Sequence, residues 1–380
     1  MAQGTPTFAV QPLASPAAAS SGEPRLTIEG NRTFLSWIET SETKDSLKFA
    51  ERTSSGWSTP LPIVSGTNLM VNAADVPSVH LLANGTLVAQ WLQEHGADPE
   101  AYDLQLSRSA DGGRTWTPPS SPHHDGTASQ HGFASLFPVP GGGFGVIWLD
   151  GRSGGDMALR ATSYGPDGKQ LPETEIDARV CECCQTAVAV TAEGPLAVFR
   201  DRSAVEIRDV YASRLVAGRW SVPALVHRDG WKITGCPVNG PAVSASGRDV
   251  AVAWFAAPAT PGHAFVSFSQ DAGRTFGAPV RLDDKAALGR VQVALLPGGA
   301  AAVVSWIDFT DGRSQFRVRR VERSGARGPA ATIAEGIGTQ YPRMVTRRDE
   351  LVFAWAENTR GTTRVRTARA PIPVAPANAK

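Results

Sequence analysis

The sequence predicts an all-β fold, a seven-bladed β-propeller made of four-stranded antiparallel blades. The first observation behind this prediction is a buried-strand pattern with an aromatic residue near its end, which recurs seven times at steps of 49 to 57 residues. The aromatic positions are Trp37, Trp91, Trp148, Phe199, Trp254, Trp306 and Trp355. The second is that further short alternating segments, separated by Gly or Asn turns, surround each of them, and no long helical period is visible. A repeat of about fifty residues with four short strands is typical of a propeller blade.

The two ends of the chain are predicted to close the ring. The last repeat stops after its third strand, at residues 363–367, and an unpaired strand pattern occupies residues 7–12. Pairing this N-terminal strand with the last blade would remove an open sheet edge, which otherwise invites aggregation. We therefore divide the chain into a flexible N-terminal segment, residues 1–24, which contains the closing strand, and a single propeller domain, residues 25–380.

Two turns carry a second repeated motif. Residues 109–116 read Ser-Ala-Asp-Gly-Gly-Arg-Thr-Trp, and residues 269–276 read Ser-Gln-Asp-Ala-Gly-Arg-Thr-Phe. In each copy we expect the Asp side chain to accept hydrogen bonds from the backbone of the turn and the Gly to supply a positive φ. Both copies resemble the Asp-box, or BNR, repeat of the sialidase superfamily of β-propellers. The box is a folding device, so the resemblance implies a fold rather than an activity. Sialidases have six blades, which makes six the alternative to seven.

The composition limits the possible partners and locations. The formal net charge is +1 and the pI is about 7.8, so nothing in the charge balance indicates nucleic acid or an anionic membrane surface as a partner. No apolar run reaches the length of a transmembrane helix. Residues 1–24 are rich in Ala, Pro, Ser and Gly, as in a tether that follows a removed signal sequence or a lipid anchor. We expect a monomeric exported protein in its mature form, periplasmic or extracellular, with or without a lipid anchor. A cytosolic protein with a flexible start is the alternative.

Propeller geometry predicts which distant residues share a face. The innermost strand of each blade starts at one face and the second strand returns to it. The segments before first strands and after second strands therefore meet around one mouth of the channel, whereas the Asp-boxes fall on the opposite face. Binding and catalytic residues favour loops held by a rigid scaffold. We therefore expect the functional site, with a small-molecule or glycan ligand, at this mouth.

Acidic residues recur around the predicted mouth. Five of the seven repeats carry a carboxylate two residues after the aromatic position, at Glu39, Asp150, Asp201, Asp308 and Glu357. A repeated acid of this kind is typical of a structural pair with an arginine or with the backbone of a neighbouring blade. The functional alternative is that one or two of these acids, with Asp150 as a candidate, serve as general acid or base.

Arginines from several repeats are predicted to reach the same mouth. They are Arg152, Arg200, Arg202, Arg290 and Arg343. We expect Asn239 to lie at the mouth as a further ligand-binding residue. A guanidinium binds a carboxylate through two parallel hydrogen bonds, so a convergent set indicates an anionic ligand. Arginine–carboxylate pairs between blades are the structural alternative.

The resemblance to sialidases implies roles for some of these residues. Sialidases hold the substrate carboxylate with three arginines, use a tyrosine paired with a glutamate as nucleophile, and use an aspartate as acid and base. Tyr341, before the inner strand of the last repeat, resembles that tyrosine, and Asp75 would be the acid. Arg290 and Arg343 would be two of the arginines. The family's first arginine lies in a Phe/Tyr-Arg-Ile-Pro motif, and residues 22–26 read Gly-Glu-Pro-Arg-Leu instead, which leaves the implied catalytic set incomplete.

The four cysteines are the most distinctive feature of the sequence. Three form Cys181-Glu-Cys183-Cys184, and the fourth is Cys236. Alignment of neighbouring repeats gives Cys181 and Cys236 equivalent positions, so we expect their sulfurs to lie close together. One interpretation is disulfides, with Cys236 bonded to one member of the triplet. A second is a thiolate site for Cu(I) or Zn, with His131 as a further ligand, and a third is a reactive thiol. On an extended strand, Cys181 and Cys183 would point one way and Cys184 the other.

Two further motifs have both a structural and a functional interpretation. His123-His124-Asp125 follows the first Asp-box, and a histidine pair with an acid can bind a metal, whereas a solvated loop is the alternative. Trp231 lies shortly before Cys236. It is expected either to cover the mouth, where it would stack on a sugar ring, or to pack in the core.

These observations give two main functional hypotheses. The segments Cys-Glu-Cys-Cys-Gln-Thr and Gly-Cys-Pro-Val-Asn-Gly-Pro resemble a distinct exported bacterial subgroup of sialidase-like propellers. The first hypothesis is an exported propeller that binds an anionic or carbohydrate ligand at its mouth, for which the resemblance implies glycosidase activity of the exo-α-sialidase type. The second is a soft-metal-binding protein that uses the four cysteines, with Cu(I) or Zn as its cofactor. A structural propeller with disulfides that docks a partner is the remaining alternative.

Overall fold

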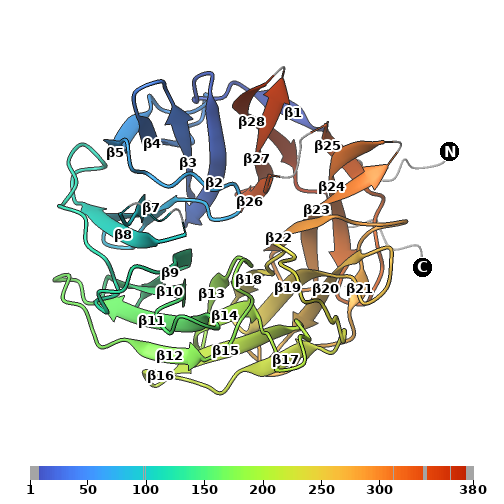
Figure 1. Cartoon of the computed structure of the whole chain (residues 1–380). Coiled ribbons are helices and arrows are strands. Elements are labelled where there is room, and N and C mark those ends of the chain that lie inside the picture. The colour runs from blue at the N-terminus through green and yellow to red at the C-terminus, as the bar shows by residue number, and fades with distance from the viewer. Residues whose placement is uncertain are drawn as a thin grey trace.

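The computed structural model shows seven antiparallel sheets arranged in a ring, which confirms the predicted seven-bladed propeller (Figure 1). The structure describes residues 8–96, 98, 100–310, 312–336, 340–359 and 361–373.

Blades one and two contain β2 (Ser21–Glu29), β3 (Arg32–Thr40), β4 (Asp45–Glu51), β5 (Leu61–Gly66), β6 (Ser78–Leu81), β7 (Leu87–Glu94) and β8 (Tyr102–Ser109). Blades three and four contain β9 (His131–Val139), β10 (Gly143–Asp150), β11 (Ala158–Tyr164), β12 (Thr174–Asp177), β13 (Ala187–Thr191), β14 (Gly194–Arg200), β15 (Val210–Val216), β16 (Arg219–Trp220) and β17 (Ala224–His227). Blades five to seven contain β18 (Ala242–Ser246), β19 (Asp249–Ala256), β20 (His263–Ser269), β21 (Val280–Arg281), β22 (Gly289–Leu295), β23 (Ala301–Thr310), β24 (Arg313–Glu322), β25 (Ala331–Glu335), β26 (Arg343–Arg347), β27 (Glu350–Thr359) and β28 (Thr362–Pro371).

Within each blade, consecutive strands pair with one another, so the first strand is innermost and the fourth outermost. Blade two departs slightly from this plan, because its sheet has three strands and a single bridge between Leu106 and Ser120 takes the fourth position. In blade four, β15 pairs with both β16 and β17.

The ring is closed by β1 (Gln11–Leu13), which pairs antiparallel with β28. The N-terminal strand is thus the fourth strand of the last blade, as the orphan pattern predicts, although residues 1–7 lie outside the described part of the chain. The expected boundary between residues 24 and 25 falls within β2, the inner strand of blade one. Residues 8–24 therefore contribute to two blades. Residues 11–13 cover the open edge of the last blade, and residues 21–24 begin the inner strand of the first.

The repeated aromatic residues lie in the core. Trp37, Trp148 and Trp254 are completely buried on the second strands of their blades. Each large apolar side chain buried in this way contributes roughly 1.5–3 kcal/mol to folding. The apolar clusters run across blade boundaries, and one of them joins Leu196, Trp254 and Trp306 of three successive blades. This continuous packing fixes each blade relative to its neighbours.

The Asp-boxes stabilise turns on the face opposite the predicted mouth. Asp271 accepts hydrogen bonds from the backbone nitrogens of Arg274 and Thr275 at 3.0 and 2.9 Å. Gly113 of the other box has a φ of 86°, and a Cβ atom there would meet the ring of Phe49 in blade one. An open hollow of about 550 Å³ lies over the Asp271 box, but the Asp271 carboxylate is already fully engaged with the turn.

The described residues form no helix, and accordingly none of them forms a helix able to cross a membrane.

Candidate functional site

A chamber lies on the channel axis where the inner strands begin. Its lining includes Arg25 and His80 on the first two inner strands, and Tyr341 and Arg343 at the start of the last. The chamber has a volume of about 110 Å³ and shares Arg25 and His80 with a channel cavity of about 420 Å³ that extends toward the Asp-box face. Only the larger cavity falls within the usual range for small-molecule sites.

Tyr341 connects two of the chamber's arginines. Its hydroxyl donates a hydrogen bond to the carbonyl of Val238 and accepts one from Arg290. The Arg290 and Arg343 guanidinium carbons lie 4.3 and 5.4 Å from the centroid of the tyrosine ring, in cation–π contact with it. Burial raises the pKa of Tyr341 above its usual value despite the arginines, so the hydroxyl is protonated at neutral pH.

Arg343 carries an unsatisfied hydrogen-bond donor. Its Nε donates to the carbonyl of Pro24 at 3.3 Å, whereas its Nη2 is buried and has no hydrogen-bond partner. Burial, followed by repulsion from Arg25, lowers the pKa of Arg343 well below its usual value. A buried guanidinium of this kind is costly unless a further acceptor pairs with it.

Asp75 is a buried acid whose charge interacts with that of Arg25. It is 3% exposed, accepts a hydrogen bond from the backbone nitrogen of Phe133, and feels the charge of Arg25. Burial raises the pKa of Asp75 to about 7, because the hydrogen bond and the arginine offset the loss of solvation only in part. Burial likewise lowers the pKa of His80 to about 3, so this imidazole is neutral.

Loops from other blades cover the chamber on its mouth side. Gln185 donates a hydrogen bond to the carbonyl of Ala74 and accepts one from the nitrogen of Gly240 at 3.1 Å. A Cβ atom at Gly240 would lie 2.1 Å from the Gln185 carbonyl oxygen, so only glycine fits this crossing. Asn239 accepts a hydrogen bond from the Arg290 nitrogen at 2.9 Å and thereby positions the start of β22.

Arg200 and Trp231 are packed together beside this covering layer rather than facing a ligand. Arg200 is 1% exposed and donates to three backbone carbonyls, those of Arg208, Asn239 and Phe255. Its guanidinium carbon lies 4.8 Å from the Trp231 ring centroid, and Trp231 is 5% exposed. Both side chains therefore join blades four and five.

The four cysteines come together between blades four and five. Cys181 is bonded to Cys184 and Cys183 to Cys236, with Cα atoms 5.6 and 6.2 Å apart. Residues 182 and 183 form a turn, which differs from the extended strand expected for this segment and lets Cys181 face Cys184. In these bonded pairs no sulfur is a free thiolate, which is the form a soft metal would require.

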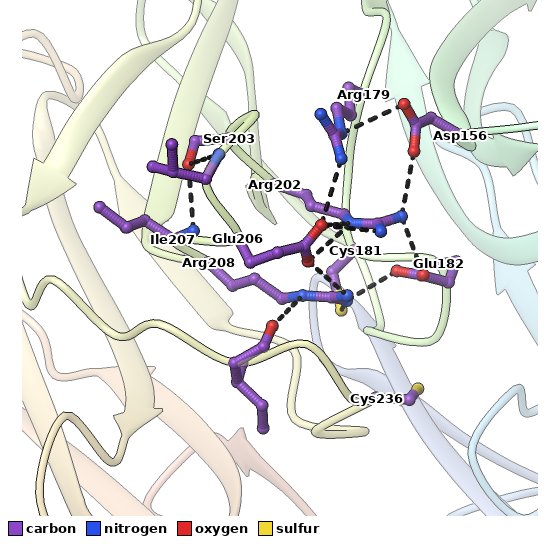
Figure 2. Close-up of polar contacts among 12 residues, drawn as sticks. Asp156, Arg179, Cys181, Glu182, Arg202, Ser203, Glu206, Ile207, Arg208 and Cys236 are labelled. Carbon is purple, nitrogen blue, oxygen red and sulfur yellow. Dashed lines mark hydrogen bonds and ion pairs between the residues drawn. The ribbon is translucent and has the colours of Figure 1, made fainter.

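A network of charged side chains lies beside the Cys181 sulfur (Figure 2). Arg208 lies 3.4 Å from the Cys181 sulfur and 2.6 Å from Glu182. Arg202 pairs with Glu206 at 2.9 Å and also reaches Glu182. These arginines are thus neutralised within the network, away from Arg25 and Arg343.

Arg152 belongs to a third group. It pairs with Asp150 at 2.7 Å, and Asp150 also accepts a hydrogen bond from Trp148 at 2.7 Å. His131 lies beside Asp150 rather than beside the cysteines, and its ring stacks on His123 with centroids 3.7 Å apart. The five expected arginines are therefore distributed over separate clusters, and only Arg290 and Arg343 meet at the chamber.

Sequence reasoning missed several residues of these clusters. They are Arg25 and His80 in the chamber, Gln185 above it, Asp103 beside the stacked histidines, and Arg208 beside the sulfurs. Arg25 directly follows Pro24 in the segment inspected for the first sialidase arginine, so a search that allowed either side of the proline would have found it.

Solved structures with similar folds are glycan-active propellers. The polysaccharide lyase Uly1 matches with a TM-score of 0.56 and 12% identity over 92% of this chain and 89% of that one. The endosialidase of phage phi92 matches with a TM-score of 0.54 and 7% identity over 99% and 70%. The K499G mutant of NanB sialidase from Streptococcus pneumoniae matches with a TM-score of 0.50 and 9% identity over 90% and 83%. No protein-family model matches the sequence, and no curated protein matches it significantly. At these identities the likeness shows the fold alone.

Proposed function

We propose that this protein is an exported sialidase-like propeller that binds the carboxylate of an acidic sugar in the chamber formed by Arg25, Tyr341 and Arg343. The observation that carries the proposal is the buried Nη2 of Arg343, a charged donor without an acceptor among the described residues. A carboxylate is the acceptor whose geometry and charge match a guanidinium.

The charge balance of the chamber supports an anionic ligand. Arg25 and Arg343 each bring a positive charge, and the charge of Arg25 disfavours that of Arg343. The acid near them, Asp75, has a pKa of about 7 and is only partly ionised at neutral pH. His80 and Tyr341 are neutral. An anion would therefore relieve repulsion and supply the missing acceptor in one step.

The dimensions of the cavity support a sugar acid over a small inorganic ion. The chamber of about 110 Å³ has room for a carboxylate with its first carbons, and the adjoining cavity of about 420 Å³ has room for the remainder of a sugar. Structures with a similar fold include the NanB sialidase and an ulvan lyase bound to a glucuronate-containing oligosaccharide. Sialic acid and glucuronate both carry a carboxylate, so these precedents agree with the arginine chamber.

Glycoside hydrolysis is the reaction that we propose for this site. Asp75, with its pKa of about 7, is suited to protonate a leaving-group oxygen at neutral pH. Tyr341 would be the nucleophile by analogy with sialidases, but Arg290, rather than a glutamate, contacts its hydroxyl. Sugar binding and turnover are tested separately.

Calorimetric titration with N-acetylneuraminate and glucuronate tests binding. The uncharged methyl esters of both sugars are the ligand controls. We expect Arg25→Gln and Arg343→Lys to weaken binding of the acids by about 10-fold or more, because each loses a charge-assisted or bidentate hydrogen bond. Arg32→Gln is the matched control, since Arg32 is half exposed and pairs with Glu51 outside the channel. Equal binding of acid and ester would contradict the proposal, and so would unchanged binding in both variants.

Release of a fluorophore from its sialoside and glucuronide tests turnover. We expect activity that is lost in Asp75→Asn and in Tyr341→Phe while ligand binding persists. Formation of an unsaturated sugar product instead would replace hydrolysis with elimination. Binding without any turnover would leave the protein as a lectin-like propeller.

A further inference from the structure

His123 and His131, which come from different segments of the chain, stack on each other beside Asp103 of blade two. His131 begins β9, and His123 lies in the segment that follows the fourth-strand position of blade two. Their rings are parallel within 3° and 3.7 Å apart. Asp103 on β8 approaches both, with its Oδ1 at 3.7 Å from His123 Nε2 and at 3.8 Å from His131 Nδ1.

The nitrogens that face Asp103 are buried and unsatisfied. His131 is 0% exposed, and neither of its ring nitrogens has a hydrogen-bond partner in the described structure. The Nε2 atom of His123 is also buried without a partner. Buried polar atoms are nearly always hydrogen-bonded or bound to an ion, so two orphan nitrogens aimed at one carboxylate oxygen indicate that something is bound between them.

The spacing of these three atoms fits a metal ion. Ligand atoms held at about 2.1 Å from one tetrahedral ion lie about 3.4 Å from one another. The measured separations from Asp103 Oδ1 to the two nitrogens, 3.7 and 3.8 Å, approach this value and exceed a hydrogen-bond length. An imidazole nitrogen binds a metal in the plane of its ring, so the two stacked rings would have to tilt toward each other, and Asp103 to move closer, to hold one ion.

The opposite edges of the imidazole rings face a second carboxylate, Asp125, whose Oδ2 atom is likewise buried without a hydrogen-bond partner. Asp125 Oδ2 lies 3.2 Å from His131 Nε2 and 3.6 Å from His123 Nδ1. Metal-binding histidines usually offer their second nitrogen to a carboxylate in this way, which fixes the tautomer and the ring orientation. His95 similarly holds the second oxygen of Asp103 at 2.8 Å. Because Arg152 already pairs with Asp125 at 3.3 Å, we take the Asp103 edge as the ligand edge, with Asp125 and His95 as its supporting residues.

The charge around the cluster also favours a cation. The acids in contact are Asp103, Asp125, Asp150 and Glu173, and the permanently charged cation that faces them is Arg152. These carboxylates and this guanidinium amount to four acidic groups against one basic group. Arg152 pairs with Asp125, Asp150 and Glu173. Its positive charge is therefore used on the Asp125 side of the cluster and not on Asp103.

We propose that Asp103, His123 and His131 form a binding site for a divalent transition-metal ion of the Zn²⁺ type. Two imidazole nitrogens and one carboxylate oxygen are ligands that Zn²⁺ accepts, with a fourth position left for water. The site is separate from the arginine chamber and from the cysteines. It therefore stands whether or not the protein binds a sugar.

The test is Zn²⁺ titration of the full chain after chelator treatment, without reductant so that the disulfides stay intact. Calorimetry should give one Zn²⁺ per chain, and the bound metal should raise the melting temperature. Asp103→Asn keeps the side-chain shape and should weaken binding by about 100-fold or more, since it removes a ligand. His95→Gln should weaken it by about 10-fold, the lower end of effects seen for residues that support a ligand.

Two controls separate this site from other sources of binding. His124→Gln changes the exposed neighbour of His123, which contacts Gln170 outside the cluster, and should bind Zn²⁺ as the wild type does. The absorption spectrum of the Co²⁺-loaded protein should lack a thiolate-to-metal charge-transfer band, because no cysteine is a ligand. Absence of binding, unchanged affinity in a folded Asp103→Asn variant, or a thiolate band would each overturn the proposal.

Discussion

Arg200 of blade four donates a hydrogen bond from its Nε to the carbonyl oxygen of Asn239, which precedes the inner strand of blade five, at 2.9 Å. The same guanidinium donates to the carbonyls of Arg208 and Phe255. One buried arginine thus satisfies three backbone acceptors from two blades. The sequence suggests that Arg200 binds a ligand, but in the structure its hydrogen bonds join two blades of the ring.

We predict that Arg200→Met lowers the free energy of unfolding by about 3–5 kcal/mol, because it leaves buried carbonyls without donors. Chemical denaturation measures this change. Arg366→Gln, which breaks the partly exposed pair with Glu357, is the control and should cost less than about 1 kcal/mol. A cost for Arg200→Met as small as that of the control would show that the three hydrogen bonds contribute little.

The sulfurs are predicted to be fully oxidised in the folded protein. Alkylation followed by intact-mass measurement should label no cysteine without reductant and four with it. Cys236→Ser should expose one alkylatable thiol, on Cys183, and lower the free energy of unfolding by about 4 kcal/mol, since the bond joins residues 53 apart in sequence. Free thiols in the untreated protein would instead favour the soft-metal or reactive-thiol interpretation.

Asp75 is predicted to make stability depend on pH. Its folded pKa of about 7 lies above the usual value of about 4, so the folded state holds the proton more tightly than the unfolded state. The stabilisation is complete below pH about 4 and is lost as the pH rises through 7. Relative to Asp75→Asn, the wild type should therefore lose up to about 4 kcal/mol across this interval. A constant difference between the two proteins would contradict the raised pKa.

The Asp-box acid should show the opposite dependence. Burial works to raise the pKa of Asp271, but hydrogen bonds from Thr275 and Ser269 outweigh it and lower the pKa to about 2. Its stabilisation is complete above pH about 4 and is lost as the pH falls toward 2. Asp271→Asn should cost about 1 kcal/mol at pH 7, a value reduced by solvent screening, and the difference from wild type should narrow in acid. Melting temperatures at several pH values measure both effects.

Much of the fold was predictable because the repeat is a local property. Each tryptophan strand is an alternating or fully apolar segment with a turn on either side, and such patterns depend on neighbours in sequence. The closing role of the N-terminal strand also followed, since a last repeat with three strands leaves one edge to be paired. The extent of β2 could not be predicted. Its first residues, Ser21 and Gly22, pair with Glu39 and Ile38, and a bulge that has no sequence signature separates these pairs from the rest of the strand.

The chamber could be predicted only in part. Tyr341, Arg343 and Asp75 were expected near the mouth from their places before inner strands. Tyr341 and Arg343 line the chamber, whereas Asp75 contacts the Phe133 nitrogen and is not among the lining residues. Arg200 and Arg202 were expected there too, but the first turns into the interface with blade five and the second toward Glu206. Side-chain direction after a strand depends on the path of the loop and on the nearest partners, which the sequence does not specify.

The sequence by itself determined the number of blades, their strand order and the face on which each loop emerges, because hydrophobic periodicity and turn residues act over short distances. Only the tertiary structure decided which polar groups meet. Arg25 lies near Arg343 where the first and last blades meet, His131 stacks on His123 rather than joining Cys181, and a two-residue turn brings Cys181 to Cys184. These contacts depend on ring closure and on the packing of whole blades, and no local pattern encodes that geometry.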